Sequence, residues 1–493
     1  MKILFVNAPW LTKDFIGIRA GSRWAHVRGI KSQLKYAPFP FKMAYSAAIL
    51  EKNNVKVKII DTLAEEMREN EFLKTVKKFS PDLVVSECST PSIYIDYQNA
   101  EKIKQTVDTK IAFVGNHISA LPNEVLKNEN VDFGLMGEYD YTLRDLVLNF
   151  GKEKRYSKTL GLAYKKSNKI YVNKRRPLIK NLDDLPLPAR HLFKMENYNE
   201  SFCGHFPNMQ VLTSRGCPFS CIFCLEPWVI YGKSYRVRSI PSVLEEIEML
   251  MNTYKPNEIY FDDSTFTVFE KRTIDLCEGM MNRGLDIPWS CMTTANCIRN
   301  KKMLEKMRES GCERIKIGLE SADEDVLRII GKPYVLTHVR KVLEWAKECD
   351  LKIHLTSMVG LPGQTIHSVR KTKRFIQSLA KKGLVYSLQT SFAVPFPGTK
   401  FYEMAKKNKW LITENWAKYD GSCNCVVSYP KLTKEEIVKL QNELRSSWKY
   451  SSLPPSLLLQ KVNRLINQRG ILSGSWWSFK KTIDYIYHKI VGY

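Results

Sequence analysis

Short apolar runs alternate with longer amphipathic stretches over the first 145 residues of the chain. Runs of this length between stretches with helical spacing are typical of strands that alternate with helices. The rhythm predicts a doubly wound parallel sheet with helices on both faces, whose ligands bind beyond the carboxyl ends of the strands. The predicted strands are residues 2–7, 55–61, 83–88, 110–115 and 133–137.

The same rhythm returns between residues 205 and 400. Six strand–helix units, rather than the eight of a closed barrel, predict an open, partial (β/α)6 barrel. Several of these strands end in polar or flexible residues, which packing alone does not require. The predicted strands are residues 209–213, 258–262, 289–293, 314–318, 352–358 and 386–394.

Four regions follow from this pattern. Residues 1–150 form the first α/β domain and residues 201–400 the partial barrel. Between them, residues 151–200 are expected to contain a β-hairpin and a proline-rich, semi-rigid linker. Residues 401–493 are expected to form a small helical region, with a helix at 432–450 and apolar positions at helical spacing further on.

Composition narrows the class of protein. The chain has 493 residues, 44% of them hydrophobic, and no apolar run approaches the ~18 residues of a membrane span. Most of the twelve cysteines are scattered singly in apolar segments, which favours the reduced cytoplasm over disulfides. The formal net charge of +25 suits nucleic acid, an anionic membrane or an acidic substrate, but compositional drift explains it equally well.

The segment Ser-Arg-Gly-Cys-Pro-Phe-Ser-Cys-Ile-Phe-Cys at residues 214–224 carries the clearest chemistry. It places three thiols, Cys217, Cys221 and Cys224, directly after a predicted barrel strand. Thiolates suit zinc or iron–sulfur clusters, and a closed zinc site needs four protein ligands. Three thiolates suit a cubane cluster with one open iron; a zinc knuckle or three core thiols are the alternatives.

This segment, with Phe223 before its last cysteine, resembles the cluster loop of radical S-adenosylmethionine (radical SAM) enzymes. The resemblance implies that the three cysteines hold a [4Fe–4S] cluster whose open iron binds SAM. Glu320 has an alternative role as a helix cap, and Asp263 could likewise be a helix N-cap. The residues that the resemblance assigns to SAM are Phe223, Asp262, Asp263, Ser264, Asn296, Glu320, Ser321 and Gly360.

The first domain resembles the cobalamin-binding domain that precedes many radical SAM barrels, through residues 114–122 and 132–140. The D-x-H-x-x-G motif that supplies an axial histidine elsewhere is absent, so His117 is expected to be a loop or edge residue rather than an axial ligand. The alternative is a degenerate Rossmann-like domain. The residues assigned to cobalamin are Asn7, Ser86, Cys88, Gly115, Asn116, His117, Gly137 and Glu138.

Two further stretches bear on the substrate. Residues 17–29 form a long basic and aromatic connection, read as a substrate loop through Arg19, Arg23 and Trp24, or else as a solvated basic loop. Residues 453–493 are basic, aromatic and amphipathic, which suits a membrane surface or packing against the barrel. The pair Cys423 and Cys425 is expected to be plain reduced thiols rather than a metal site.

The resemblance implies that an electron from a reduced ferredoxin or flavodoxin cleaves SAM to a 5′-deoxyadenosyl radical that activates a C–H bond. The main hypothesis is formation of C–C bonds or rings on a membrane lipid or isoprenoid, because residues 19–24 look closest to the lipid-acting branch. The alternative is a cobalamin-dependent C-methyltransferase on a natural product or tetrapyrrole. tRNA modification ranks lower without a recognisable RNA-binding module, so no nucleic acid partner is expected; a non-catalytic cluster protein ranks last. The expected location is the cytoplasm, with peripheral membrane contact.

Overall fold

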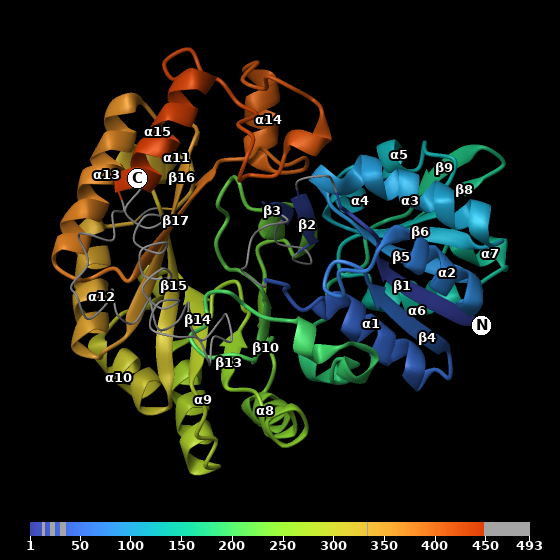
Figure 1. The fold of residues 1–493 in the computed structure, drawn as a ribbon, viewed down its shortest axis with the longest axis horizontal. Coiled ribbons are helices and arrows are strands. Elements are labelled where there is room, and N and C mark those ends of the chain that lie inside the picture. Colours follow the sequence, from blue (N-terminus) through green and yellow to red (C-terminus); the bar gives the residue numbers. More distant parts are fainter. Residues whose placement is uncertain (12–14, 20–24, 30–35, 333, 448–493) are drawn as a thin grey trace, which may run out of the picture.

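The computed structural model describes residues 1–11, 15–19, 25–29, 36–332 and 334–447. Two α/β units lie side by side, the N-terminal sheet on the right of Figure 1 and the partial barrel on the left. Both are the units that the strand–helix rhythm predicts.

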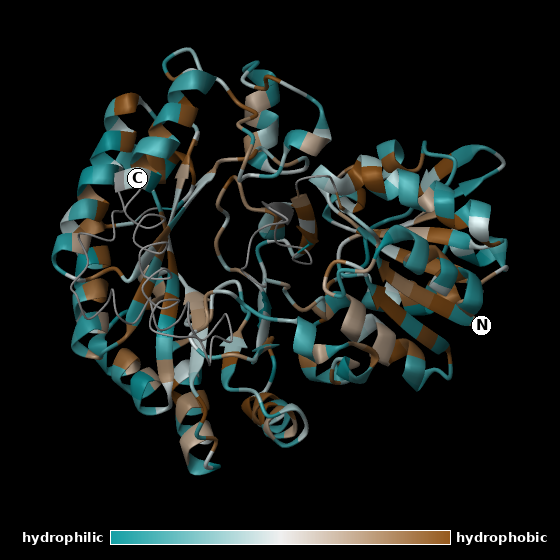
Figure 2. Cartoon of the chain, viewed as in Figure 1, coloured by the Kyte–Doolittle hydropathy of each residue, from teal (hydrophilic) through white to brown (hydrophobic). Residues whose placement is uncertain are grey.

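The N-terminal unit is a seven-stranded sheet in the order β4-β1-β5-β6-β7-β8-β9. Its first five strands are parallel, and their apolar sequences colour the sheet brown in Figure 2, as expected under helices on both faces. The strand order reverses between β1 and β5, which is where such sheets bind ligands. The strands are β1 (Lys2–Asn7), β4 (Lys56–Asp61), β5 (Leu83–Cys88), β6 (Lys110–Gly115), β7 (Phe133–Leu135), β8 (Leu162–Lys166) and β9 (Lys169–Val172).

The hairpin that the sequence places in the linker belongs to this sheet. Strand β8 pairs antiparallel with β7, so the sheet continues to Val172 instead of ending near residue 150. The pairing covers the edge that β7 would otherwise expose. The helices of this unit are α1 (Phe41–Lys52), α2 (Glu69–Phe79), α3 (Ile93–Thr106), α4 (Asn116–Ala120), α5 (Pro122–Val125), α6 (Asp140–Leu148) and α7 (Glu153–Tyr156), with the 3-10 turn η1 (Thr90–Ser92).

The stretch after β1 is a hairpin and not only a loop. Strands β2 (Phe15–Arg19) and β3 (Ala25–Gly29) pair antiparallel. Gly17 packs its backbone against the ring of Trp10, where a Cβ would come within 1.9 Å of the indole. The glycine therefore allows the hairpin to lie on that ring.

The second unit is a six-stranded parallel sheet in the order β10-β13-β14-β15-β16-β17, the expected open barrel. The predicted number of strands is correct, and their ends differ by a few residues. The cluster segment leads into a further small sheet of β11 (Ser214–Gly216) and β12 (Tyr235–Val237), which the sequence pattern did not reveal. The barrel strands are β10 (Asn208–Val211), β13 (Glu258–Phe261), β14 (Trp289–Thr293), β15 (Cys312–Glu320), β16 (Lys352–Val359) and β17 (Ser387–Phe392).

Helices cover the outside of these strands (Figure 1). They are α8 (Ile240–Tyr254), α9 (Glu270–Asn282), α10 (Lys301–Glu309), α11 (Glu324–Ile329), α12 (Leu336–Glu348), α13 (Ile366–Lys381), α14 (Lys400–Lys407) and α15 (Lys434–Ser447). The short elements are η2 (Leu182–Asp184), η3 (Arg190–Leu192), η4 (Met195–Asn197), the π-helix η5 (Glu226–Ile230), η6 (Ala295–Cys297) and η7 (Trp416–Lys418).

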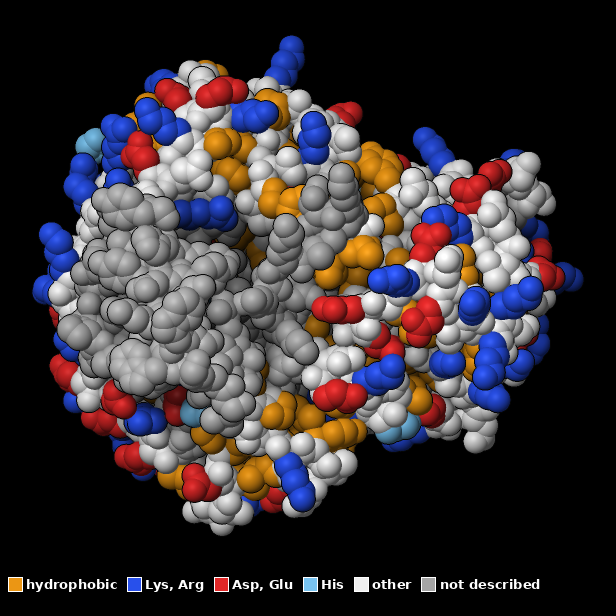
Figure 3. Space-filling model, viewed as in Figure 1, with side chains coloured by type: hydrophobic (Ala, Val, Ile, Leu, Met, Phe, Trp, Pro, Cys, Tyr) orange, Lys and Arg blue, Asp and Glu red, His pale blue; other side chains and the backbone are white. Residues whose placement is uncertain are grey.

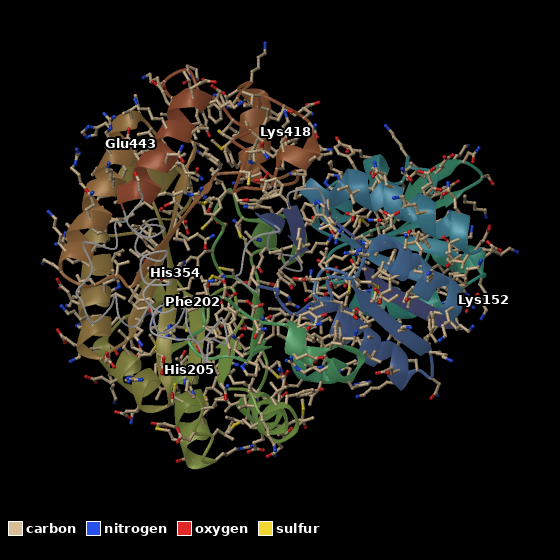
Figure 4. The ribbon with its side chains drawn as sticks, viewed as in Figure 1. Lys152, Phe202, His205, His354, Lys418 and Glu443 are labelled. Carbon is tan, nitrogen blue, oxygen red and sulfur yellow. The ribbon has the colours of Figure 1, made fainter. Side chains whose placement is uncertain are left out.

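The amino-terminal end of the barrel is closed by the chain that enters it. Glu258, at the start of β13, accepts hydrogen bonds from the backbone of Gly204 (2.6 Å) and His205 (2.8 Å). The ring of Phe202 packs edge-on against His354, with centroids 5.4 Å apart (Figure 4). A ligand therefore reaches the barrel interior from the carboxyl ends of the strands.

The linker is fastened to the barrel by a buried ion network. Arg190 in η3 donates to Glu246 on α8 (2.7 Å) and to the Gln210 carbonyl (2.6 Å). Arg238 donates to the other oxygen of Glu246. Burial alone would raise the pKa of Glu246, but the two guanidinium charges outweigh it and lower the pKa.

We expect the Glu246→Gln variant to be destabilised by about 3–5 kcal/mol, because it leaves two buried guanidinium groups without a carboxylate. The folded-state pKa of Glu246 lies below its unfolded value, so this carboxylate stabilises the fold above pH 4.5 and its contribution fades as the pH falls through the lower value. Urea unfolding at pH 7 and pH 4 measures both effects.

Glu245→Gln is the matched control, because Glu245 is exposed on the same helix. Equal unfolding midpoints for the two variants would contradict the structural role of the network.

Candidate active site

The cysteine segment forms a loop between β11 and β12, at the carboxyl end of the barrel. Gly216 has a positive φ of 89°, and a Cβ there would lie 2.2 Å from the Ser234 carbonyl, so only glycine fits. The loop is held from two sides: Ile222 donates to the Ile330 carbonyl (3.0 Å), and Phe401 donates to the Ile222 carbonyl (3.0 Å). Its shape is therefore set by the barrel rather than by the loop alone.

The three thiols of this loop are half-buried and free of disulfides. Burial raises the pKa of Cys217, raises the pKa of Cys221 to about 11 and raises that of Cys224 well above its usual value. Cys217 Sγ lies 3.4 Å from Thr265 Oγ1, and the Trp228 indole donates to the Cys221 carbonyl (3.0 Å). Metal ligation must therefore displace protons from these thiols.

A buried ion pair stands beside the loop. Lys332 Nζ lies 3.0 Å from Glu320 Oε1, and the Thr356 hydroxyl donates to both oxygens of that carboxylate at 3.2 and 3.3 Å. Burial opposes the charge of Lys332, but Glu320, with smaller contributions from Tyr334 and Cys221, outweighs it and the pKa of Lys332 is raised. Gly318 makes room for the pair, since a Cβ there would meet Glu320 Oε1 at 2.3 Å and Lys332 Nζ at 2.6 Å.

The sequence analysis did not single out Lys332. The one feature that could have pointed to it is its position shortly after the end of α11. The helix-cap alternative for Glu320 is wrong, because Asp323 is the N-cap of α11 and accepts from the Val326 amide (3.2 Å). Glu320 has a φ of 63°, a rare conformation for a non-glycine residue and one that often marks a functional site.

Three residues assigned to SAM serve the scaffold in this structure. Asp263 is fully buried and accepts from both the amide and the hydroxyl of Thr213 and from the Ser214 amide, so it ties the loop after β10 to β13 and is not an N-cap. Ser321 accepts from the Asp323 amide (3.2 Å).

The turn at Gly360 is likewise satisfied within the protein. Its amide donates to Gln364 Oε1 (2.8 Å), and its carbonyl accepts from the Tyr429 hydroxyl (2.6 Å). A Cβ at Gly360 would contact Val427 and Ile437 at 3.5 Å, so this side of the glycine faces the C-terminal segment, and its contact with SAM stays a prediction.

The remaining residues assigned to SAM stay at the rim of the barrel. Asp262 and Asn296 are half-buried where the chain leaves β13 and enters η6. The Ser264 hydroxyl donates to Glu226 of η5, and Phe223 packs at the edge of the barrel core. These four positions remain predictions.

The two units are joined by a second ion network, directly before the cysteines. Arg215 donates to Asp140 (2.9 Å) and to Glu138 (3.2 Å) of the N-terminal unit, and Arg236 donates to both oxygens of Glu138 at 2.9 and 3.0 Å. Burial alone would lower the pKa of Arg215, but the two carboxylates outweigh it and raise the pKa. Glu138 therefore joins the two units through these arginines, and its assignment to cobalamin stays a prediction.

The other residues assigned to cobalamin lie together at the carboxyl edge of the N-terminal sheet. Gly115 must be glycine there, because its φ is 113° and a Cβ would meet the Cys88 carbonyl at 2.4 Å. The Gly137 amide donates to Ser119 Oγ (2.9 Å). The buried members of this group are Asn7, Ser86, Cys88, Gly115, Asn116 and Gly137.

His117 is fully buried below this edge. Its Nδ1 lies 3.2 Å from the Thr90 hydroxyl, and its Nε2 faces Glu124 at 3.8 Å. Trp416 covers the ring edge-on, with centroids 5.5 Å apart. The structure places His117 in the short helix α4 with its ring packed among protein side chains, and its relation to cobalamin stays a prediction.

Arg19 is held inside the N-terminal unit, and its assignment to the substrate stays a prediction. Its guanidinium is fully buried, paired with Asp96 and donating to the Ala8 carbonyl (2.9 Å). Arg23, Trp24 and residues 453–493 lie outside the described residues. Cys425 is buried and Cys423 exposed, and both are free thiols.

Two family models match the chain. The radical SAM superfamily matches residues 211–376 and the B12 binding domain matches residues 27–147. An uncharacterised methyltransferase of Pyrococcus horikoshii is 34% identical over 426 residues, which are 86% of this chain and 90% of that protein. The chain belongs to the radical SAM enzymes with a B12-binding domain.

More distant relatives of this radical SAM enzyme differ in their named reactions. The anaerobic magnesium-protoporphyrin IX monomethyl ester cyclase of Cereibacter sphaeroides is 26% identical over 74% of this chain, which spans 60% of the cyclase. The hopanoid C-3 methylase of Methylococcus capsulatus is 21% identical over 77% of this chain and 71% of the methylase.

Solved structures agree on the fold. The methyltransferase TsrM from Kitasatospora setae, with cobalamin and a [4Fe–4S] cluster bound, superposes with a TM-score of 0.69 at 14% identity, covering 99% of this chain and 98% of TsrM. The cobalamin-dependent enzyme OxsB, with aqua-cobalamin and SAM bound, gives 0.71 at 16% identity, covering 100% and 76%. The cofactors of this enzyme are a [4Fe–4S] cluster, SAM and cobalamin.

The residues present fit the cluster. Three free thiols stand in one loop beside the open end of the barrel. Throughout the part of the chain that the structure describes, no three His, Cys, Asp or Glu side chains converge on a single metal ion. Three thiolates are the ligands that a cubane cluster with one open iron requires, so the donor set of this loop suits such a cluster.

The residues present also fit cobalamin. Several buried polar atoms near the carboxyl edge of the N-terminal sheet have no hydrogen-bond partner among the described residues, and each such atom costs about 1–3 kcal/mol. Cobalamin carries many amide groups, which both donate and accept. The unpartnered atoms are Asn7 Oδ1, Lys42 Nζ, Ser46 Oγ, Asn116 Oδ1 and the Tyr139 hydroxyl.

On the face of the molecule that Figure 3 shows, positive and negative side chains are mixed. Lys and Arg side chains are spread there over both units among Asp and Glu. No basic stripe of the kind that binds nucleic acid is visible among the described residues on this face. Within the described ranges, none of the helices has the length and apolar character needed to cross a bilayer.

We expect anaerobically purified enzyme to hold about four irons per chain. The Cys221→Ala variant should lose most of this iron, because a cubane with two thiolates is not retained. Iron analysis and visible absorbance measure the loss. The control is Cys423→Ala, which removes an exposed thiol elsewhere; full iron content in the Cys221 variant would refute the assignment.

Proposed function

We propose that this enzyme is a C-methyltransferase that places a methyl group from cobalamin on an unactivated carbon of its substrate. The observation that carries the proposal is the relative from Pyrococcus, a methyltransferase by name, which aligns along nearly its whole length. We take the C-methyltransferase alternative over the lipid ring-forming hypothesis, because the relatives named above include a methyltransferase and a methylase.

The arrangement of the two units supports methyl transfer. Arg215 stands two residues before Cys217 and binds carboxylates of the cobalamin unit. A methyl donor and a radical initiator must act on one substrate carbon, so their separation has to be held constant. The buried clamp holds the start of the cluster loop against the N-terminal unit.

When bound, the cluster and SAM supply a radical that abstracts hydrogen, and cobalamin supplies the methyl group. The chain's own part is to bind, orient and exclude water. We assign Cys217, Cys221 and Cys224 to the cluster, and the Glu320–Lys332 pair to polar groups of SAM. Asn7, Asn116, Tyr139 and Lys42 would satisfy the amides of cobalamin.

The substrate class is a separate part of the proposal. A tetrapyrrole or natural product is the first candidate, because the Cereibacter relative is named for a porphyrin ester. A lipid is the second, favoured by the likeness to the hopanoid C-3 methylase. Either substrate is compatible with access from the open end of the barrel.

To test methyl transfer, the reconstituted enzyme is incubated anaerobically with methyl-labelled SAM, a reductant and separate lipid and tetrapyrrole extracts of its host. We expect one extract to gain a labelled compound and 5′-deoxyadenosine to form. Deoxyadenosine without label in any product would favour ring formation instead, and the absence of both would contradict the proposal.

Lys42 allows a sharper test of the cobalamin site. Burial, followed by the charge of Arg215, lowers the pKa of Lys42 to about 8, while burial raises the pKa of the neighbouring Glu87 to about 7. The ammonium faces the ring of Tyr231 at 5.0 Å but has no hydrogen-bond acceptor. A phosphate or amide carbonyl of the cofactor would supply that acceptor.

We expect Lys42→Met to weaken cobalamin binding about tenfold and yet stabilise the cofactor-free protein by up to about 3 kcal/mol at pH 7. The folded pKa lies below the unfolded one, so the penalty of Lys42 is complete below pH 8 and disappears as the pH rises towards 10.5. Absorbance titration and thermal unfolding between pH 7 and pH 10 measure the two effects.

Lys52→Met is the control, because Lys52 is exposed at the end of the same helix. If the Lys42→Met variant binds cobalamin as tightly as the wild type, Lys42 does not contact the cofactor, whatever the stability of the variant.

A further inference from the structure

Trp228 links the cluster loop to the surface. It belongs to η5, which follows the three cysteines, and its ring is half-buried beside the apolar residues of that turn. Its indole Nε1 donates to the backbone carbonyl of Cys221 (3.0 Å). One aromatic side chain therefore touches both solvent and the backbone of a residue assigned to the cluster.

Two lysines from distant parts of the chain converge on this indole. Lys400 Nζ lies 4.8 Å and Lys233 Nζ 5.8 Å from the ring centroid. Lys400 begins α14, on the side of the barrel that faces the N-terminal unit in Figure 1, and Lys233 lies in the exposed turn after η5.

Both ammonium groups remain open to solvent. Neither forms an ion pair with a carboxylate among the residues that the structure describes. An exposed cation–π contact contributes only about 0.5–1 kcal/mol and leaves the positive charge unneutralised. The surface over Trp228 is thus a small aromatic patch with two positive charges that no described carboxylate neutralises, a combination that suits an acidic protein partner.

The position of the patch indicates which acidic partner it fits. The cluster needs one electron from outside for each SAM that it cleaves reductively. Electron transfer between proteins requires their redox centres to come close, and such encounters are small and steered by charge. Trp228 offers a surface contact with a hydrogen bond to the cluster loop itself.

We propose that Trp228, Lys233 and Lys400 form the docking site for an acidic one-electron carrier protein. A single electron passes from the reduced carrier to the oxidised cluster; no bond is made or broken, and the carrier is oxidised by one electron. The inference rests on the proposed function only in requiring a redox-active cluster, and it holds whether the substrate is methylated or cyclised.

The test follows reduction of the cluster in the loaded enzyme by stopped-flow absorbance, with reduced flavodoxin as the probe. The Lys233→Glu/Lys400→Glu variant should be reduced about tenfold more slowly at low ionic strength, and its rate should depend less on salt. Reduction by dithionite, which needs no protein docking, should proceed at the wild-type rate. The control Lys77→Glu/Lys78→Glu makes the same charge change on exposed lysines of α2 and should behave as wild type.

Equal flavodoxin rates in the double variant and the wild type would overturn the proposal. So would loss of binding to anionic vesicles or RNA in that variant while flavodoxin still reduces it normally. If the Lys233→Glu/Lys400→Glu variant contains less iron than the wild type, the neutral Lys233→Gln/Lys400→Gln variant is tested instead. A several-fold slower reduction of its cluster by flavodoxin supports docking at these lysines. An unchanged rate excludes it. If neither flavodoxin nor dithionite lowers the visible absorbance of the wild-type enzyme, the protein holds no reducible cluster and the cluster assignment itself is contradicted.

Discussion

The structure depends on the desolvation of Arg215. A buried guanidinium is costly unless carboxylates meet it, and here Glu138 and Asp140 come from the neighbouring unit to do so. Arg236, paired with Arg215 across β11 and β12, binds the same Glu138. The base of the cluster loop is thereby tied to the cobalamin unit. Any shift of one unit against the other would leave charges buried without partners.

The same principle separates scaffold residues from residues that face ligands. Asp263, Ser321 and Glu138 have their hydrogen-bonding capacity used within the protein, so their polar character is explained without a cofactor. Lys42, Asn116 and Tyr139 are as deeply buried but have unpartnered polar atoms. Buried polar groups normally find hydrogen-bond partners. A group without a partner at the carboxyl edge of the N-terminal sheet is most simply explained by a ligand that provides the missing hydrogen bond.

The candidate site could be anticipated only in part. Cys217, Cys221 and Cys224 are close in sequence, so their spacing together with the family resemblance of the segment predicted a cluster loop. Glu320 was found through its place at a strand end, but its partner Lys332 follows a helix and carries no motif. Glu138 was expected beside cobalamin, whereas arginines 77 and 98 residues further along the chain bind it. Such pairings depend on three-dimensional proximity, which local patterns do not encode.

The sequence by itself determined the parallel strands of both sheets, the number of barrel strands and the cluster motif. Each of these follows from the periodicity of apolar residues or from short spacings, which a linear reading captures. The tertiary structure decided that the hairpin at β8 and β9 completes the first sheet, that Arg19 is a buried partner of Asp96, and which acids remain for ligands. The reason is desolvation: whether a polar side chain serves the fold or a ligand depends on which groups surround it once water is removed.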